Sequence, residues 1–183
     1  MKSEFNRYVV LLRGINVGGN NIISMNRLKE KLVFFGFCDV ETYINSGNIL
    51  VSSIEDSEQV KRDVGLIIKR EFDLDINVYV IKCETLIEVS QSCPDWWNQE
   101  ENVRQNVLFV IPPLTVEHVN KQIGELNPTI EKSTYTNQVI FWSVKNEYYS
   151  KSKYSKILGK SFYSNLTIRN ANTFNKLVEL CQK

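Results

Sequence analysis

The sequence is poor in the residues on which metal sites and disulfide frameworks depend. It contains one histidine, His118, and four cysteines, none of them in a CxxC pair. A conventional zinc site needs more histidine and cysteine ligands than this chain offers. The scattered cysteines also suit a reducing cytoplasm better than a disulfide framework. We therefore expect no metal, no cofactor and no disulfides, and the single histidine to be an ordinary surface or partly buried residue.

Long hydrophobic runs are also missing. A membrane-spanning helix needs roughly 18 consecutive apolar residues, and no stretch approaches that length. The apolar run Val9–Leu12 is too short for the core of a signal peptide, and charged residues surround it. The sequence thus predicts a cytoplasmic protein with no membrane partner.

A strong overall charge of either sign is absent as well, because the net charge of the 183 residues is +1. The charge is nevertheless uneven: residues 145–183 hold eight basic and two acidic side chains, a net charge of +6. This basic segment is either an ordinary solvated surface or part of a site for an anionic partner. The neutral average excludes a general electrostatic attraction to nucleic acid.

Apolar periodicity predicts the order β-α-β-β-α-β in the first half, the ferredoxin-like unit. Ser24 is a suitable N-cap for the first helix, and Gly36 can end that helix at its C′ position. That helix should bury Met25, Leu28, Leu32 and Phe35, and the second Val60, Val64, Ile67 and Ile68. The expected strands are residues 7–13, 40–44, 49–53 and 76–81, and the second helix is residues 56–72.

The second half repeats this order less clearly. The expected strands are residues 107–111, 130–135, 139–144 and 166–169; the expected helices are residues 84–91, a segment capped by Thr115, residues 153–160 and a final helix burying Phe174, Leu177, Val178 and Cys181. The fold class is therefore α+β, with two ferredoxin-like repeats at residues 1–82 and 83–183. The second repeat includes a linking helix and an extra C-terminal helix. No linker rich in proline, glycine or serine divides the repeats, so we expect them to pack together.

The stretch LLRGINVGGNN, residues 11–21, follows the first strand and resembles a phosphate loop. It lacks the lysine and hydroxyl residue that a Walker loop carries after its glycines. Its GxxxGG spacing also differs from the GxGxxG of dinucleotide-binding folds. Two interpretations remain: a tight turn that uses glycine and asparagine for positive φ, or a general binding loop in which Arg13 attracts an anion.

Topology favours a binding loop, because the first two strands of a ferredoxin-like unit run parallel. The end of the first strand should therefore lie beside the hairpin that follows the second. This places Arg13 and Asn16 near Asn45, Ser46 and Asn48, all of which we predict to be ligand-binding residues.

The same geometry applies to the last two strands of the second repeat. It brings Lys151 and Lys153 close to Arg169, Asn170 and Asn172, a second predicted ligand-binding group at the start of the final helix. A cation beside a helix N-terminus is electrostatically disfavoured unless something negative is nearby, so Arg169 points to an anion. Whether the two groups form one site is left open by the sequence.

Two stretches carry a family pattern. Residues 11–53 contain, in order, LLRGINVGG, Met-x-x-Leu, Gly-Phe, Thr-Tyr and Ser-Gly-Asn, and residues 152–177 contain Ser-Lys, Thr-x-Arg-Asn-x-Asn-Thr and Lys-Leu. By these patterns the chain closely resembles the bacterial "domain of unknown function 1697" family over nearly its full length. The resemblance implies a duplicated ferredoxin-like fold in a cytoplasmic bacterial protein. It implies no catalytic residues, because the family has no established reaction.

Two positions depart from that family. Many relatives carry lysine after the paired glycines, and an aromatic residue is common between the last two asparagines of the pattern. This chain has Asn20, Asn21 and Ala171 at these positions. Both departures weaken a model in which lysine and ring stacking bind a nucleotide.

Binding of a small phosphate- or carboxylate-bearing ligand is the function that these residues favour most. Nucleic acid is a weaker alternative partner, because Tyr43, Phe109, Phe141 and Trp142 are expected in the core and not on an open sheet face. A small enzyme that stabilises charge with arginine, lysine and asparagine is a second alternative. The third is an interaction scaffold that uses Trp96 and Trp97, although these rings equally suit a cover over the join between the repeats. The sequence does not indicate catalytic residues or an oligomeric state.

Overall fold

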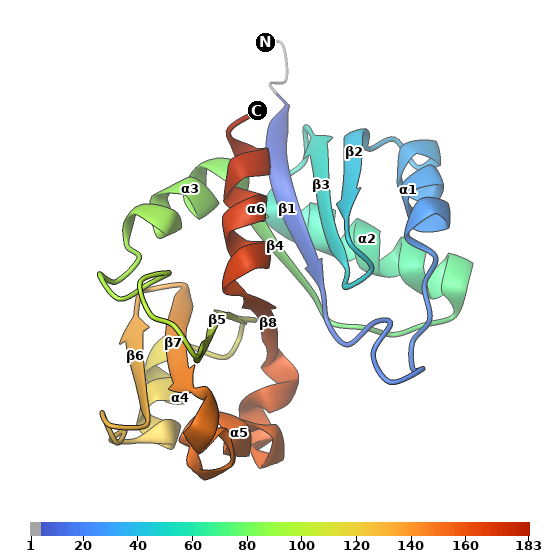
Figure 1. The fold of residues 1–183 in the computed structure, drawn as a ribbon. Helices are drawn as coiled ribbons and strands as arrows, with labels where there is room; N and C mark the ends of the chain where they lie inside the picture. The colour runs from blue at the N-terminus through green and yellow to red at the C-terminus, as the bar shows by residue number, and fades with distance from the viewer. Residues whose placement is uncertain (1–4) are drawn as a thin grey trace. The chain divides into compact units, whose positions relative to one another are not determined.

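The computed structural model describes residues 5–183 (Figure 1). Within them the chain forms two compact units. The first unit consists of the described residues up to Ile87 together with Cys181–Lys183, and the second is Glu88–Leu180. Helix α3 (Cys83–Gln91) runs across the boundary between the two segments.

The first unit follows the predicted order β-α-β-β-α-β. Its elements are β1 (Asn6–Leu12), α1 (Met25–Phe34), β2 (Cys38–Tyr43), β3 (Asn48–Ser53), α2 (Ser57–Phe72) and β4 (Val78–Lys82). The strand order in the sheet is β2-β3-β1-β4, and every neighbouring pair is antiparallel. The unit is therefore ferredoxin-like, as the sequence predicts.

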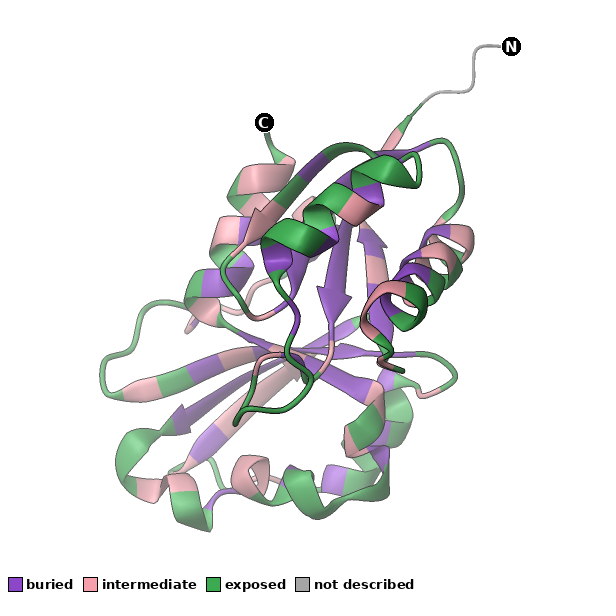
Figure 2. Ribbon diagram, turned by 90° about the vertical axis from the view of Figure 1, so that its right-hand side faces the viewer, coloured by how far each residue is buried: buried purple, intermediate pink, exposed green. Residues whose placement is uncertain are grey.

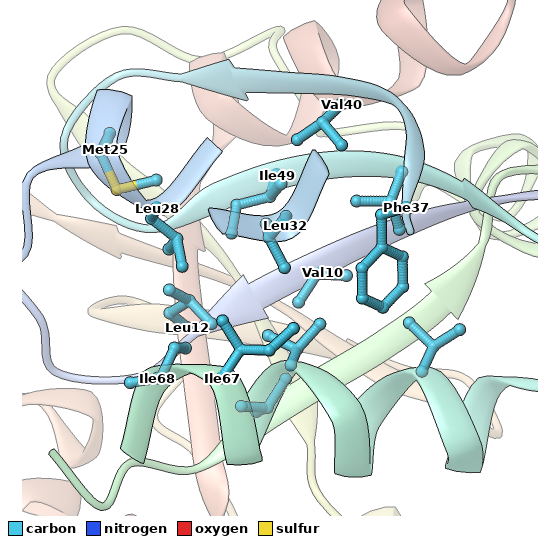
Figure 3. Packing of buried hydrophobic residues seen from close by; sticks show 14 of the residues in the cluster. Val10, Leu12, Met25, Leu28, Leu32, Phe37, Val40, Ile49, Ile67 and Ile68 are labelled. Carbon is cyan, nitrogen blue, oxygen red and sulfur yellow. The ribbon is translucent and has the colours of Figure 1, made fainter. Parts of the chain in front are cut away.

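Helices α1 and α2 cover one face of this sheet (Figure 1). Alternate residues of a strand point to the same face, so Val10 and Leu12 of β1 meet the buried side chains of both helices (Figure 3). The buried residues of α2 are the four predicted ones: Val60, Val64, Ile67 and Ile68.

The first helix differs from its prediction at one end. Ser24 is the N-cap, and its hydroxyl accepts a hydrogen bond from the Arg27 N–H at 3.3 Å. The prediction that Phe35 points inward is wrong: Phe35 is 37% exposed, whereas Phe37 is 8% exposed and belongs to the core. The reason is that α1 ends at Phe34, so the helical spacing no longer applies at Phe35.

The second unit repeats the topology. Its elements are β5 (Val103–Val110), α4 (Val116–Ile123), β6 (Glu131–Tyr135), β7 (Val139–Lys145), the 3-10 helix η1 (Asn146–Lys151), α5 (Lys153–Lys156), further 3-10 turns at Ile157–Gly159 and Ser161–Asn165, β8 (Leu166–Asn170) and α6 (Ala171–Cys181). The strand order is β6-β7-β5-β8, again fully antiparallel. The largest differences from the predictions are at two places: β5 begins at Val103, and the α-helix predicted for residues 153–160 continues as 3-10 turns after Lys156.

Both faces of this second sheet are covered. On one face, Leu108, Ile140 and Trp142 pack with apolar residues of α4 and of the segment that follows β7. On the other face, Trp97, Phe109, Phe141 and Phe174 form an aromatic cluster; the ring centroids of Trp97 and Phe141 are 5.1 Å apart, and those of Phe141 and Phe174 are 5.7 Å apart. Figure 2 shows buried residues concentrated in the strands. None of the helices in residues 5–183 has the length and apolar character that a membrane crossing requires.

Candidate ligand site

The predicted meeting of the glycine-rich loop and the following hairpin is present in the first unit. The Leu12 N–H donates to the Gly47 carbonyl at 2.8 Å, and the Asn16 side chain donates to the Asn45 carbonyl at 2.8 Å. Both contacts join the end of β1 to the turn between β2 and β3. The parallel direction of β1 and β2 therefore brings these two loops together, as the sequence predicts.

Asn16 holds this arrangement together. Its Nδ2 donates to the carbonyls of Ile23 and Asn45, and its Oδ1 accepts the Ile23 N–H at 2.9 Å. Asn16 itself has a φ of +53°, a left-handed conformation that asparagine tolerates better than most residues. Both amide hydrogens are thus used inside the protein, which gives Asn16 a structural role beside its predicted ligand-binding role.

In the Ser-Gly-Asn turn, the side chain of Asn48 forms hydrogen bonds within the turn itself and so has a structural role. Asn48 is fully buried, and its Nδ2 donates to the Tyr43 carbonyl at 3.1 Å and to the Ser46 hydroxyl at 3.0 Å. The half-buried Arg13 follows β1, and its backbone N–H donates to the Asn77 carbonyl at 3.0 Å. Of the predicted residues in this unit, Asn16 and Asn45 line a surface hollow of about 490 Å³.

A larger hollow, of about 730 Å³, lies in the second unit where β5 begins and β8 ends. It collects residues from the segment after β7 and from the start of α6, which the strand directions bring to one sheet edge. Half of its lining residues carry a side-chain amide. These amide residues are Asn98, Gln105, Asn106, Asn170, Asn172 and Asn175; the others include Arg104, Glu100, Tyr149 and Tyr154.

Arg104 supplies the positive charge of this hollow. Its guanidinium carbon lies 4.2 Å from the centroid of the Tyr149 ring, and its Nε donates to Asn146 Oδ1 at 3.1 Å. Stacking and one hydrogen bond orient the guanidinium without neutralising it. Within residues 5–183 Arg104 forms no ion pair, and its two Nη groups make no hydrogen bond to the protein.

The amides around Arg104 are partly fixed. Asn170 caps α6, since its Oδ1 accepts the Thr173 N–H at 2.8 Å. Gln105 is buried; it accepts the Asn98 N–H and donates to the Trp96 carbonyl. Asn172, in the first turn of α6, is exposed. The hollow therefore combines amide groups that are held by hydrogen bonds, those of Asn170 and Gln105, with the exposed side chain of Asn172, which can turn toward a ligand.

Three predicted residues of the second group do not line this hollow. Arg169 is buried on β8, and its Nη1 donates to the Thr167 hydroxyl and to the Ile168 carbonyl; burial lowers the pKa of its guanidinium to about 10. Lys153 donates through Nζ to the Ile123 carbonyl at 2.8 Å. Lys151 is exposed at the end of η1.

The Ser-Lys pair of the family pattern has a structural role at the start of α5. Ser152 is fully buried and its hydroxyl accepts the Ser155 N–H at 3.1 Å. The next two backbone N–H groups, of Lys153 and Tyr154, donate to the buried carboxylate of Glu131, which also accepts from the indole of Trp142. A carboxylate is well placed at a helix N-terminus.

The two adjacent tryptophans occupy different environments. Trp97 is buried in the aromatic cluster, and its indole N–H donates to Asn175 Oδ1 at 3.3 Å. Trp96 is half-buried, and the Lys132 ammonium lies 5.3 Å from its ring centroid. Trp97 is thus a core residue of its unit and offers little surface to a partner. His118 is exposed on α4.

Sequence reasoning misses Arg104, Asn106 and Tyr149. A strand predicted to begin at Val107 leaves Arg104 and Asn106 in a loop with no assigned direction. No alternation of polar and apolar residues marks the start of this strand, because Arg104, Gln105 and Asn106 are three polar residues in succession. Because β5 begins at Val103, Arg104 and Asn106 lie at the sheet edge where β8 ends and α6 begins.

Comparison with known proteins identifies relatives without an assigned activity. The sequence pattern of the family described as "Protein of unknown function (DUF1697)" matches residues 5–141. The structure is similar to that of the conserved bacterial protein SP0830 from Streptococcus pneumoniae, with a TM-score of 0.87 and 33% sequence identity over 97% of this chain and 99% of that one. No curated protein matches the chain.

Proposed function

The chain belongs to the DUF1697 family of proteins of unknown function, and we propose that it binds a small anionic ligand in the hollow beside Arg104. The ligand class is a phosphate- or carboxylate-bearing molecule such as a nucleotide. The observation that carries this proposal is the guanidinium of Arg104, which is oriented by Tyr149 and Asn146 and has no carboxylate partner in the described residues. A planar guanidinium with free N–H groups binds carboxylate and phosphate oxygens in a bidentate manner.

The rest of the lining supports a polar ligand. Side-chain amides offer both donors and acceptors, so they suit the remaining polar atoms of such a molecule. The first turn of α6 contributes at the same place, because Ala171 and Asn172 line the hollow and helix N-termini favour anions.

The ionisable groups in the hollow favour binding over acid–base chemistry. Glu100 is paired with Lys132, whose Nζ lies 2.6 Å from its carboxylate. Burial and the neighbouring Tyr149 raise the pKa of Tyr154 far above the range in which a phenol exchanges protons at neutral pH.

Ligand binding is testable with a thermal-shift and calorimetric screen of inorganic phosphate, nucleotides, sugar phosphates and small carboxylates. Arg104→Ala should weaken binding of a hit by about 10- to 100-fold, the equivalent of one charge-assisted hydrogen-bonding group at 1.5–3 kcal/mol. Arg104→Lys should restore only part of this, because lysine lacks the planar fork.

The matched control is Lys156→Ala, which removes an exposed positive charge from the same unit outside the hollow. This variant should bind the hit with wild-type affinity. Equal losses of affinity in Arg104→Ala and Lys156→Ala would show that only the overall positive charge matters. A hit that binds Arg104→Ala as tightly as the wild type would contradict the proposed site.

A further inference from the structure

The outer side of β6 is an open sheet edge. β6 pairs with β7 on one side only, and no strand within residues 5–183 pairs with its other side. A groove of about 700 Å³ runs along this edge between β6 and α4. Exposed strand edges are templates for further pairing, and proteins usually protect them.

The corresponding edge of the first unit shows such protection. β2 contains an irregularity between Cys38 and Glu41, where Asp39 has a φ of +46°. The guanidinium of Arg7 binds the Asp39 carbonyl and pairs with Glu41 at 2.7 Å, which covers the same stretch. Bulges and charges of this kind oppose pairing. β6 keeps a regular register along its whole length.

The hydrogen-bond pattern identifies the groups at the open edge. The Ile130 carbonyl accepts from the Lys145 N–H, and the Thr136 N–H donates to the Val139 carbonyl. Since the residues of an antiparallel strand alternate in direction, the even-numbered residues face β7. Ser133 and Tyr135 therefore point their backbone N–H and carbonyl groups outward, as does the Glu131 carbonyl; the Glu131 N–H is bound to the Asn127 carbonyl.

We propose that this edge pairs with the same edge of a second copy of the chain to form a symmetric dimer. With the twofold axis at Ser133, the two Ser133 residues exchange N–H and carbonyl groups. Each Tyr135 N–H then reaches the Glu131 carbonyl of the other copy, which is the one Glu131 backbone group left for pairing. The two sheets become one continuous antiparallel sheet. Four hydrogen bonds join the copies, and the Tyr135 carbonyl stays outside the ladder because its counterpart, the Glu131 N–H, is bound to Asn127.

The charges along the groove are self-complementary under this symmetry. Glu117 and Lys121 lie one helical turn apart on α4, and both line the groove. A twofold axis reverses the direction of the second helix, and the proposal sets Glu117 of each copy against Lys121 of the other. Opposite charges thus meet without any requirement for a foreign partner.

The edge is also held rigidly, which lowers the entropy cost of pairing. The Glu131 carboxylate binds two N–H groups at the start of α5 and the indole of Trp142. On the opposite face of the strand, Lys132 pairs with Glu100. Few side chains of β6 need to reorder when a second strand arrives.

Sedimentation velocity and light scattering over micromolar to millimolar concentrations test the dimer. The wild type should dimerise, and Ser133→Pro should be monomeric because it removes the outward N–H. This N–H takes no part in the β6–β7 ladder, and proline is tolerated on such an edge. Ser133→Ala keeps the N–H and should remain dimeric. A wild type that is monomeric throughout, or a folded Ser133→Pro that dimerises, overturns the proposal.

Charge variants give a second test that does not depend on proline. Lys121→Glu places like charges opposite each other and should weaken the dimer, whereas the double variant Glu117→Lys with Lys121→Glu restores opposite charges and should recover it. Circular dichroism checks that each variant is folded. A double variant as weak as Lys121→Glu overturns the proposed symmetry. Capture of an unrelated extended peptide by a monomeric wild type would do the same.

Discussion

At the scale of single residues, Gly47 shows how little room the first loop cluster leaves. Its φ is +77°, and a Cβ at this position would lie 2.7 Å from Leu12 Cβ and 3.0 Å from Ile15 Cδ1. Gly47→Ala therefore combines a left-handed backbone with a clash against buried side chains. We expect a loss of about 2–4 kcal/mol in the free energy of unfolding, measured by urea denaturation.

A matched control separates the two causes. Gly19 has nearly the same φ, +78°, and a Cβ at this position would have nothing within 4 Å of it. Gly19→Ala should cost only about 1–2 kcal/mol, which is the effect of the left-handed conformation alone. Equal losses at the two glycines would mean that close packing at Gly47 contributes nothing.

At the scale of elements, an ion pair and a cation–π contact join α1 to the last turn of α2. The Lys31 ammonium lies 2.7 Å from a Glu71 carboxylate oxygen, and the Arg27 guanidinium lies 5.2 Å from the Phe72 ring centroid. The hydrogen bond from Lys31 is the main reason that the pKa of Glu71 is lowered from its usual value. Because the folded pKa is below the unfolded one, this carboxylate stabilises the fold above its unfolded pKa, and the contribution is lost as pH falls through the folded pKa.

Glu71→Gln should therefore flatten the acid limb of the stability curve. Urea denaturation from neutral pH down to about pH 3 measures this, since unfolded glutamate titrates near 4.3. Glu58→Gln is the control on the same helix, because Glu58 is exposed and its carboxylate lies 4.0 Å from Lys61. An acid limb that is unchanged in Glu71→Gln would contradict a stabilising role for the Lys31–Glu71 ion pair.

The elements also show which features a single sequence can predict. Apolar spacing identifies α2 with all four of its buried residues, and the parallel direction of β1 and β2 identifies the loops that meet. These features follow from local periodicity and topology. The role of Asn16 cannot be predicted in this way, because its partners Ile23 and Asn45 lie in loops without periodicity.

The second candidate site is predicted less completely for a related reason. Its sheet edge is identified, and Asn170 and Asn172 line the hollow, whereas their ligand-binding role stays a prediction. Arg169 and Lys153 instead point their charged groups to partners within the protein. A motif specifies which residues stand near an edge, but the hollow is also lined by residues 103–106. These belong to a β5 that begins four residues earlier than predicted.

At the scale of the whole molecule, charge and burial together argue against single-stranded RNA as a partner. Ferredoxin-like RNA platforms stack bases on aromatic side chains of an open sheet face. Here Phe109, Phe141 and Trp142 are fully buried, so the described strands of the second sheet present none of these rings for stacking. A net charge of +1 adds no general attraction to phosphates.

We therefore expect the full chain to show no measurable anisotropy change with fluorescent RNA or DNA oligomers at physiological salt. Weak binding at low salt should be charge-driven alone, with the same affinity for every sequence and a steep fall as salt increases. Lys156→Ala, which leaves the proposed ligand hollow intact, should reduce such binding as much as Arg104→Ala does. Binding that persists at physiological salt and is lost only in Arg104→Ala would instead identify the hollow as a site for a nucleic-acid phosphate.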